Sequence, residues 1–121
     1  MNYQHESLAA GRWHGFSLIE QLANIGSEVE RALLWRKRNR QDYSLMALER
    51  SLELLDLTIA DPRHRLRLRE LTRLREALLD YFMGENAFQS TEESWRNYFY
   101  SYAYAARMNR GQAPSDDSPR R

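Results

Sequence analysis

Two arginine-rich segments hold the residues most able to do chemistry in this chain. They are residues 31–40, which read RALLWRKRNR, and residues 63–75, which read RHRLRLRELTRLR. The formal net charge of the 121 residues is only +1, so both segments are local concentrations of charge. A local cationic field attracts phosphates or acidic partners even when the total charge is near zero. Lys37 is the only lysine, and arginine offers a planar donor fork that suits phosphate and carboxylate groups.

The other polar residues do not match a common catalytic or metal-binding pattern. There is no cysteine and no Glu-x-x-His pair for a di-metal site in a helical bundle. Glu53 and Asp56 form a Glu-x-x-Asp pair, but the facing acids it would need, Glu28 and Glu30, fall on different faces of their helix. No phosphate-binding loop and no nucleophile–base spacing is present. We therefore expect no enzymatic activity, no metal site and no cofactor.

Apolar residues recur at helical spacing in four segments of the chain. The first helix begins after Ser17, which forms a capping box with Glu20, and ends near residues 38–39. The second covers about residues 41–60, the third begins at Asp61-Pro62 and ends at Gly84, and the fourth begins at a second capping pair, Ser90 and Glu93. Four helices with short connections predict an all-α fold, an up-down-up-down antiparallel four-helix bundle.

The composition divides the chain into three parts. Residues 1–16 have no helical period and are predicted to be an N-terminal arm, residues 17–110 form the bundle, and the polar residues 111–121 are predicted to be a disordered tail. No apolar run approaches the ~20 residues of a membrane-spanning helix, and no signal-peptide core is present. We expect a cytoplasmic protein without a membrane partner.

Several helices carry apolar or aromatic residues outside their core stripe. A bundle needs one apolar stripe per helix, so the surplus predicts either a wide core or an interface with another subunit. We favour a homo-oligomer, because tyrosine and arginine are common in interface cores. The predicted interface residues are Tyr43, Met46, Leu54, Leu57, Arg96, Tyr100 and Tyr104.

The two arginine segments differ in how well folding explains them. The first falls at the end of a helix, where the helix dipole favours cations, and Glu85, Glu92 and Glu93 are candidate partners at the same end of the bundle. The second falls in the first turns of the predicted third helix, where the dipole opposes positive charge and like charges repel at i,i+4 spacing. A bound anion would relieve this penalty; nucleic acid, an acidic protein surface and plain solvation remain open. The predicted binding residues are Arg63, Arg65, Arg67, Arg69, Arg73, Arg107 and Arg110.

Four stretches of the chain resemble a family of small bacterial proteins of this size. They are LANIGSEVERAL (22–33), ALERSLELLDLTIADP (47–62), LREALLDYFMGEN (74–86) and SWRNYFYSYAYAAR (94–107). That resemblance implies no particular activity. In size, expected fold and charge the chain is also similar to the four-helix-bundle proteins of 23S rRNA intervening sequences and to the accessory variability proteins of diversity-generating retroelements. Those proteins form basic oligomeric rings, and the retroelement protein binds nucleic acid and a reverse transcriptase.

Together these observations predict a non-enzymatic, oligomeric helical bundle that binds RNA or DNA backbone through a basic end. Such a protein would serve as an accessory to a nucleic-acid enzyme such as a reverse transcriptase. The alternative is a protein-interaction module, an adaptor or antitoxin-like bundle with a toxin as partner, that uses the exposed faces of the second and fourth helices.

Overall fold

The computed structural model describes residues 11–112, with side chains described for residues 11–109. Its elements are α2 (Leu18–Lys37), α3 (Gln41–Ile59), the 3-10 helix η1 (Pro62–Arg67), α4 (Leu68–Met83) and α5 (Glu92–Gln112). No strand occurs within residues 11–112. The predicted all-α class is therefore confirmed, and most helix boundaries, apart from the start of α4, lie close to those expected from the periodicity.

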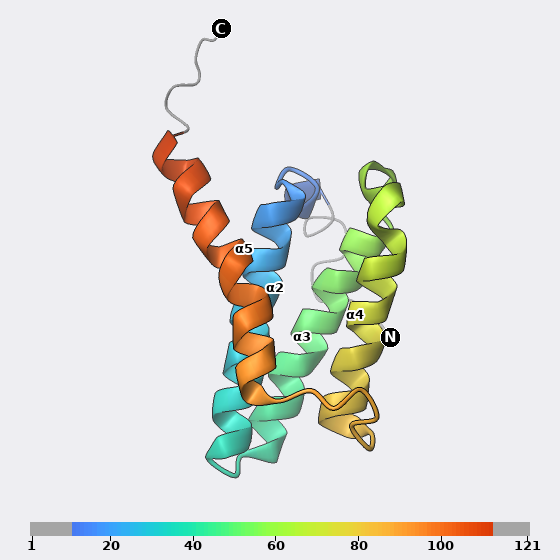
Figure 1. Cartoon of the computed structure of the whole chain (residues 1–121), viewed down its shortest axis with the longest axis vertical. Helices are drawn as coiled ribbons and strands as arrows, with labels where there is room; N and C mark the ends of the chain where they lie inside the picture. The colour runs from blue at the N-terminus through green and yellow to red at the C-terminus, as the bar shows by residue number, and fades with distance from the viewer. Residues whose placement is uncertain (1–10, 113–121) are drawn as a thin grey trace, which may run out of the picture.

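The four long helices lie in the spatial order α5, α2, α3, α4, and successive helices run in opposite directions (Figure 1). Backbones approach closely between α2 and α3, between α2 and α5, and between α3 and α4. The two outer helices, α4 and α5, are joined mainly through side chains. Figure 1 also shows α5 diverging from α2 toward its C-terminal end.

Small residues on α3 allow α2 and α3 to pack closely. Ser44, Ala47 and Ser51 are buried between leucines of the same helix, and short side chains let neighbouring backbones approach. The two buried hydroxyls keep hydrogen bonds, since Ser44 donates to the carbonyl of Ala32 (2.8 Å) and Ser51 to that of Leu48 (2.7 Å). A leucine pattern alone did not predict that these serines belong to the core.

A glycine allows the close packing of α2 and α5. A Cβ atom built on Gly26 would lie 2.7 Å from the Cβ of Phe99 and 2.8 Å from its Cγ. The Phe99 Cβ is fixed to the backbone of α5, so rotation of the buried ring cannot relieve this contact. Any side chain at position 26 must push α5 away from α2.

Two predictions about helix starts need correction. The residues after Asp61-Pro62 form a 3-10 helix with a break at His64 (φ −104°, ψ 20°), so the α-helix begins at Leu68 and not at Pro62. At the start of α5, Thr91 and Ser94 exchange side-chain-to-backbone hydrogen bonds (3.0 and 2.8 Å), so Thr91 caps the helix in place of Ser90. Ser90 is instead bound to Asn86. The capping box of Ser17 and Glu20 is confirmed.

Candidate functional site

A buried polar network organises the end of the molecule where η1 begins. Gln21 donates its amide to the carbonyl of Trp13 (2.9 Å), and its oxygen lies 2.9 Å from His64 Nε2. The Trp13 indole, 6% exposed, donates to Thr58 Oγ1 (2.9 Å). Within the predicted N-terminal arm, residues 11–16 are thus fixed to the helices through Trp13, while residues 1–10 lie outside the described range.

The same network holds an ion pair at the start of η1. Asp61, 5% exposed, accepts hydrogen bonds from the backbone N–H of Arg63 (2.9 Å) and from its guanidinium (2.7 and 2.9 Å). Arg63 also donates to the carbonyl of Phe16 (3.1 Å). These bonds from Arg63 lower the pKa of the Asp61 carboxyl to about 2. Burial lowers the pKa of His64 below its ordinary 6.5, although the carboxylate of Asp61 acts in the opposite direction.

We predict that stability falls as the pH drops from 8 to 5. His64 has a lower pKa in the folded state, so below about pH 6.5 the unfolded chain binds more protons and unfolding is favoured. The free energy of unfolding falls by up to about 1.4 kcal/mol for each pKa unit by which the folded value lies below the unfolded one. A second loss follows below about pH 4, as Asp61 protonates toward its folded pKa of about 2. Urea unfolding at pH values from 8 down to about 2 measures both losses.

Two matched variants test the assignment of the first loss. His64→Gln should remove the loss between pH 8 and 5, because glutamine retains a donor for Gln21 but does not titrate. His14→Gln, at an exposed position, should leave the loss in place. A pH profile unchanged by His64→Gln would contradict the assignment.

Two of the predicted anion-binding arginines are held by acids of the chain itself. Arg63 is paired with Asp61, as described above. Arg67 pairs with Glu70 (2.7 Å), and Glu70 also accepts hydrogen bonds from the hydroxyls of Tyr98 (3.1 Å) and Tyr102 (3.3 Å). Burial raises the pKa of Glu70, but the bonds from Arg67 and Tyr98 outweigh it and the net shift is downward. Glu70 is therefore ionised, and Arg67 neutralises it.

Three other predicted arginines lie free on the surface. Arg65, Arg69 and Arg73 are exposed, and their side chains form no hydrogen bond or ion pair within residues 11–109. By contrast, many other arginines are paired with a carboxylate. Those pairs involve Arg31, Arg40, Arg50, Arg63, Arg67, Arg75 and Arg96. The unpaired positive charges of Arg65, Arg69 and Arg73 therefore lie together on η1 and the first turns of α4.

The remaining two predicted arginines belong to α5. Arg107 is exposed and lines a shallow depression together with Phe16 and Glu20. Because Arg63 binds the carbonyl of Phe16, Arg107 lies at the same end of the molecule as η1. The side chain of Arg110 lies outside the described range.

The 3-10 helix reduces the electrostatic penalty that was predicted for the second arginine segment, residues 63–75. Arg63, Arg65 and Arg67 precede α4, so they do not occupy the first turn of an α-helix, and only Arg69 does. The break at His64 also removes a regular i,i+4 relation between Arg63 and Arg67. The predicted dipole penalty is therefore smaller than the sequence indicated, and the absence of acidic partners becomes the stronger reason to expect an anion.

The first arginine segment is stabilised mainly by aromatic rings. The Arg36 guanidinium lies 4.6 Å from the ring centre of Tyr81, Arg38 lies 5.6 Å from that of Trp35, and Arg40 lies 4.1 Å from that of Tyr43. Such cation–π contacts contribute about 0.5–1 kcal/mol each at exposed sites. Of the predicted acidic partners, Glu92 pairs with Arg96 instead. The acid that binds Arg40 is Asp42, which was not among those predicted.

A groove between α4 and α5, which the sequence did not predict, lies beside the free arginines. It has a volume of about 480 Å³ and is lined mainly by apolar atoms, with Leu74 and Ala77 from α4 and Trp95 and Tyr98 from α5. Arg69 and Arg73 also line it. We call it the α4–α5 groove. It exists because the backbones of the two outer helices do not pack closely, a property of the tertiary structure that no local pattern encodes.

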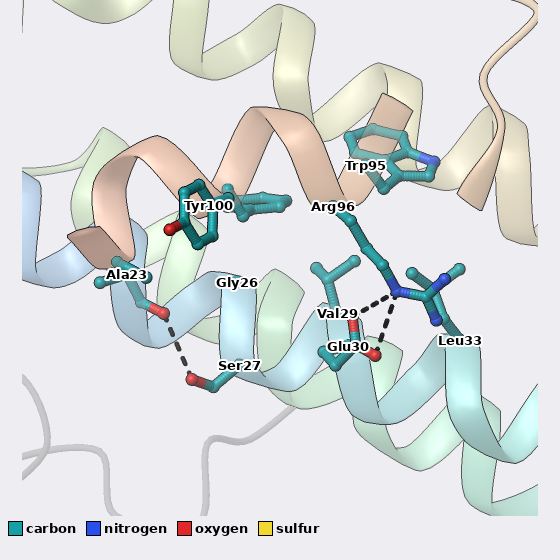
Figure 2. Close-up of a pocket in the computed structure, with 11 residues that line it drawn as sticks. Ala23, Gly26, Ser27, Val29, Glu30, Leu33, Trp95, Arg96 and Tyr100 are labelled. Atoms are coloured by element: carbon teal, nitrogen blue, oxygen red, sulfur yellow. Dashed lines mark hydrogen bonds and ion pairs between the residues drawn. The ribbon is translucent and has the colours of Figure 1, made fainter. Parts of the chain in front are cut away.

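A second, smaller groove of about 290 Å³ lies between α2 and α5, and Figure 2 shows its residues. Arg96 crosses this α2–α5 groove and binds both oxygens of Glu30 (3.0 and 3.2 Å), while its other side meets Glu92 (3.3 Å). Trp95 extends away from Tyr100 in this view (Figure 2). Two carboxylates, Glu30 and Glu92, neutralise Arg96, so the α2–α5 groove does not favour an anion.

The predicted interface residues fall into two groups. Tyr43, Met46, Tyr100 and Tyr104 are exposed by 40–61% of their surfaces. The rings of Tyr100 and Tyr104 stack with their centres 6.3 Å apart. Leu54 and Leu57 are partly buried against the core, and Arg96 is bound to Glu30.

Comparison with known proteins identifies no relative of this chain. No protein-family model, no curated protein and no solved structure matches the chain. The described residues contain no group of three or more His, Asp or Glu side chains that could hold a metal ion. No helix between residues 11 and 112 is long and apolar enough to cross a membrane.

Proposed function

We propose that the protein binds the phosphate backbone of RNA or DNA through η1 and the start of α4. The observation that carries this proposal is the set of three exposed arginines, Arg65, Arg69 and Arg73, whose side chains pair with no acid in the described part of the chain. Arginine binds phosphate through two parallel hydrogen bonds. Arg107 adds positive charge at the same end, and Arg63 and Arg67 fix the surrounding backbone.

This mode of binding has a recognisable salt dependence. Arginine–phosphate contacts release counterions from the nucleic acid, so affinity falls steeply with salt and depends little on sequence. A gel shift with RNA and DNA, single-stranded and duplex, titrated from ~50 mM salt upward, tests the proposal. Binding that weakens with salt supports it, and the absence of binding at the lowest salt overturns it.

The fold that presents this surface is, in our proposal, an up-down-up-down bundle with a loose fourth side. Three pairs of neighbouring helices pack closely, and the pair α4 and α5 is bridged by hydroxyl–carboxylate hydrogen bonds. No catalytic group is assigned, because the exposed surface at η1 offers cations and no nucleophile–base pair. An accessory role beside a nucleic-acid enzyme fits such a surface.

A second candidate function, association with another protein subunit, is favoured by one face of α5. Tyr100, Tyr104 and Met108 follow one another at i,i+4 spacing and are exposed by 61%, 49% and 46%. Such a stripe is typical of an interface between subunits.

We predict that Tyr100→Lys with Tyr104→Lys shifts an assembled protein toward the monomer. The lysines place two charges in the stripe and should not disturb the core, because the tyrosines are 61% and 49% exposed. Light scattering at high protein concentration measures the change, with Leu66→Lys, at a 98% exposed position, as the control. A wild-type protein that is already monomeric would remove this candidate function.

A further inference from the structure

The α4–α5 groove combines an apolar, aromatic lining with cations on one rim. Trp95 and Tyr98 contribute aromatic rings, Leu74 contributes an aliphatic wall, and the small Ala77 leaves room between the helices. The volume of about 480 Å³ falls within the range of small-molecule sites, about 300–1,000 Å³.

The side chain of Tyr98 is held in a fixed position within this lining. Its hydroxyl donates to Glu70 (3.1 Å), and its ring packs edge-on against Phe99 with centres 5.0 Å apart. Burial raises the pKa of the Tyr98 hydroxyl, so the hydroxyl stays protonated and keeps this bond. A ring fixed in this way loses little conformational freedom when a ligand stacks against it.

The rim of the groove carries net positive charge. Arg69 and Arg73 lie one turn apart on α4, about 6 Å along the helix axis. The acid nearest to them in the lining, Glu70, is already neutralised by Arg67 (2.7 Å). Two cations therefore remain for an anion that lies along the rim.

An occupant must match both parts of this surface, a flat apolar group inside and negative charge outside. A nucleotide within a single strand has this form, since its base can stack on aromatic rings while its phosphates meet the arginines. A duplex does not, because its bases are stacked and paired within the helix. An acyl chain would fill the apolar part but could not stack on the aromatic rings.

We infer that the α4–α5 groove receives an unstacked base of a single-stranded nucleic acid, with the adjoining phosphates bound by Arg69 and Arg73. This inference rests on the proposed function and adds a substrate class to it, single strands in preference to duplexes. Stacking of one base on an aromatic side chain contributes about 1–3 kcal/mol. That range corresponds to a preference of about 5- to 150-fold over a strand of equal charge without bases.

The test compares three labelled oligonucleotides of equal length by fluorescence anisotropy: a single-stranded oligo-thymidylate, an abasic strand and a duplex. The intact chain should bind the thymidylate at least about 5-fold more tightly than the abasic strand. Equal affinity for the two strands would overturn the inference and leave backbone binding intact. No affinity for any of the three would overturn both proposals.

A matched pair of variants places the base in the groove. Ala77→Leu fills the α4–α5 groove and should remove most of the preference for the thymidylate, with the weaker abasic binding retained. Ala103→Leu adds the same volume to the α2–α5 groove and should retain the preference. An Ala77→Leu protein with wild-type preference contradicts the assignment. So does saturable binding of a medium-chain fatty acid that Ala77→Leu blocks while oligonucleotide binding is unaffected.

Discussion

Replacing Gly26 with alanine should lower the free energy of unfolding by about 2 kcal/mol, within the range of about 1–3 kcal/mol for overpacking. The added Cβ would lie 2.7–2.9 Å from three atoms of Phe99, and the nearest of them, the Phe99 Cβ, is attached directly to the backbone of α5. A change of rotamer cannot relieve the contact, so the helix itself must move. Alanine gains about 1 kcal/mol of helix propensity over glycine, and we expect the steric loss to exceed this gain. Urea denaturation followed by circular dichroism measures the difference.

Gly11→Ala is the matched control for that experiment. Gly11 lies in a helical turn, and a Cβ built there has no heavy atom within 4 Å. The control should be neutral or slightly stabilised, whereas Gly26→Val should be destabilised further than Gly26→Ala. If both alanine variants unfold at the same urea concentration, the inferred close contact between Gly26 and Phe99 is contradicted.

Replacing Arg65, Arg69 and Arg73 together with glutamine should weaken nucleic-acid binding by about 10- to 100-fold at low salt. Each of these arginines is exposed and without an acidic partner in the described part of the chain, so its removal leaves no buried carboxylate unpaired and should not unfold the protein. The slope of log K against log salt for a single strand should also fall by about 2, since three phosphate contacts contribute about 0.7 each. Anisotropy titrations at several salt concentrations measure both quantities.

The control for the triple variant removes the same charge from another place. Arg31, Lys37 and Arg38 are exposed residues near the end of α2, far from η1 in Figure 1. At about 0.1–0.15 M salt their replacement with glutamine should change the affinity by less than about 3-fold, because the long-range field is then screened within about 8–10 Å. An equal loss in both triple variants would mean that net charge alone governs binding, and the proposed surface would then be wrong.

Local sequence signals were sufficient for most of the fold. The capping box at Ser17, the Asp61-Pro62 boundary and the end of the helix at Gly84 are set by short-range chemistry, and each was predictable. The 3-10 geometry of residues 62–67 was not, because proline at the first position suits either kind of helix. The choice depends on His64, whose burial against Gln21 is a contact across 43 residues.

The site was predictable in its charge but not in its shape. Arg65, Arg69 and Arg73 stood out by composition, whereas the pairing of Arg63 and Arg67 became visible only once Asp61 and Glu70 were placed beside them. The α4–α5 groove had no sequence signal, since its walls are ordinary core residues such as Leu74 and Trp95. What makes them a groove is the distance between two helices that are not packed together.

The loose contact between α4 and α5 also sets how easily the molecule can widen. The described hydrogen bonds between these two helices run from Tyr98 and Tyr102 to the single carboxylate of Glu70, and Tyr81 touches the edge of Trp95 (6.1 Å between ring centres). Separating α5 from α4 would break a few such interactions, at about 0.5–1.5 kcal/mol for each hydrogen bond, but the close packing of α5 against α2 at Gly26 and Phe99 would have to shift as well. Glu70 thus connects the two outer helices, and a chain with alanine at this position would lose both hydrogen bonds and hold its fold with a wider and more variable opening.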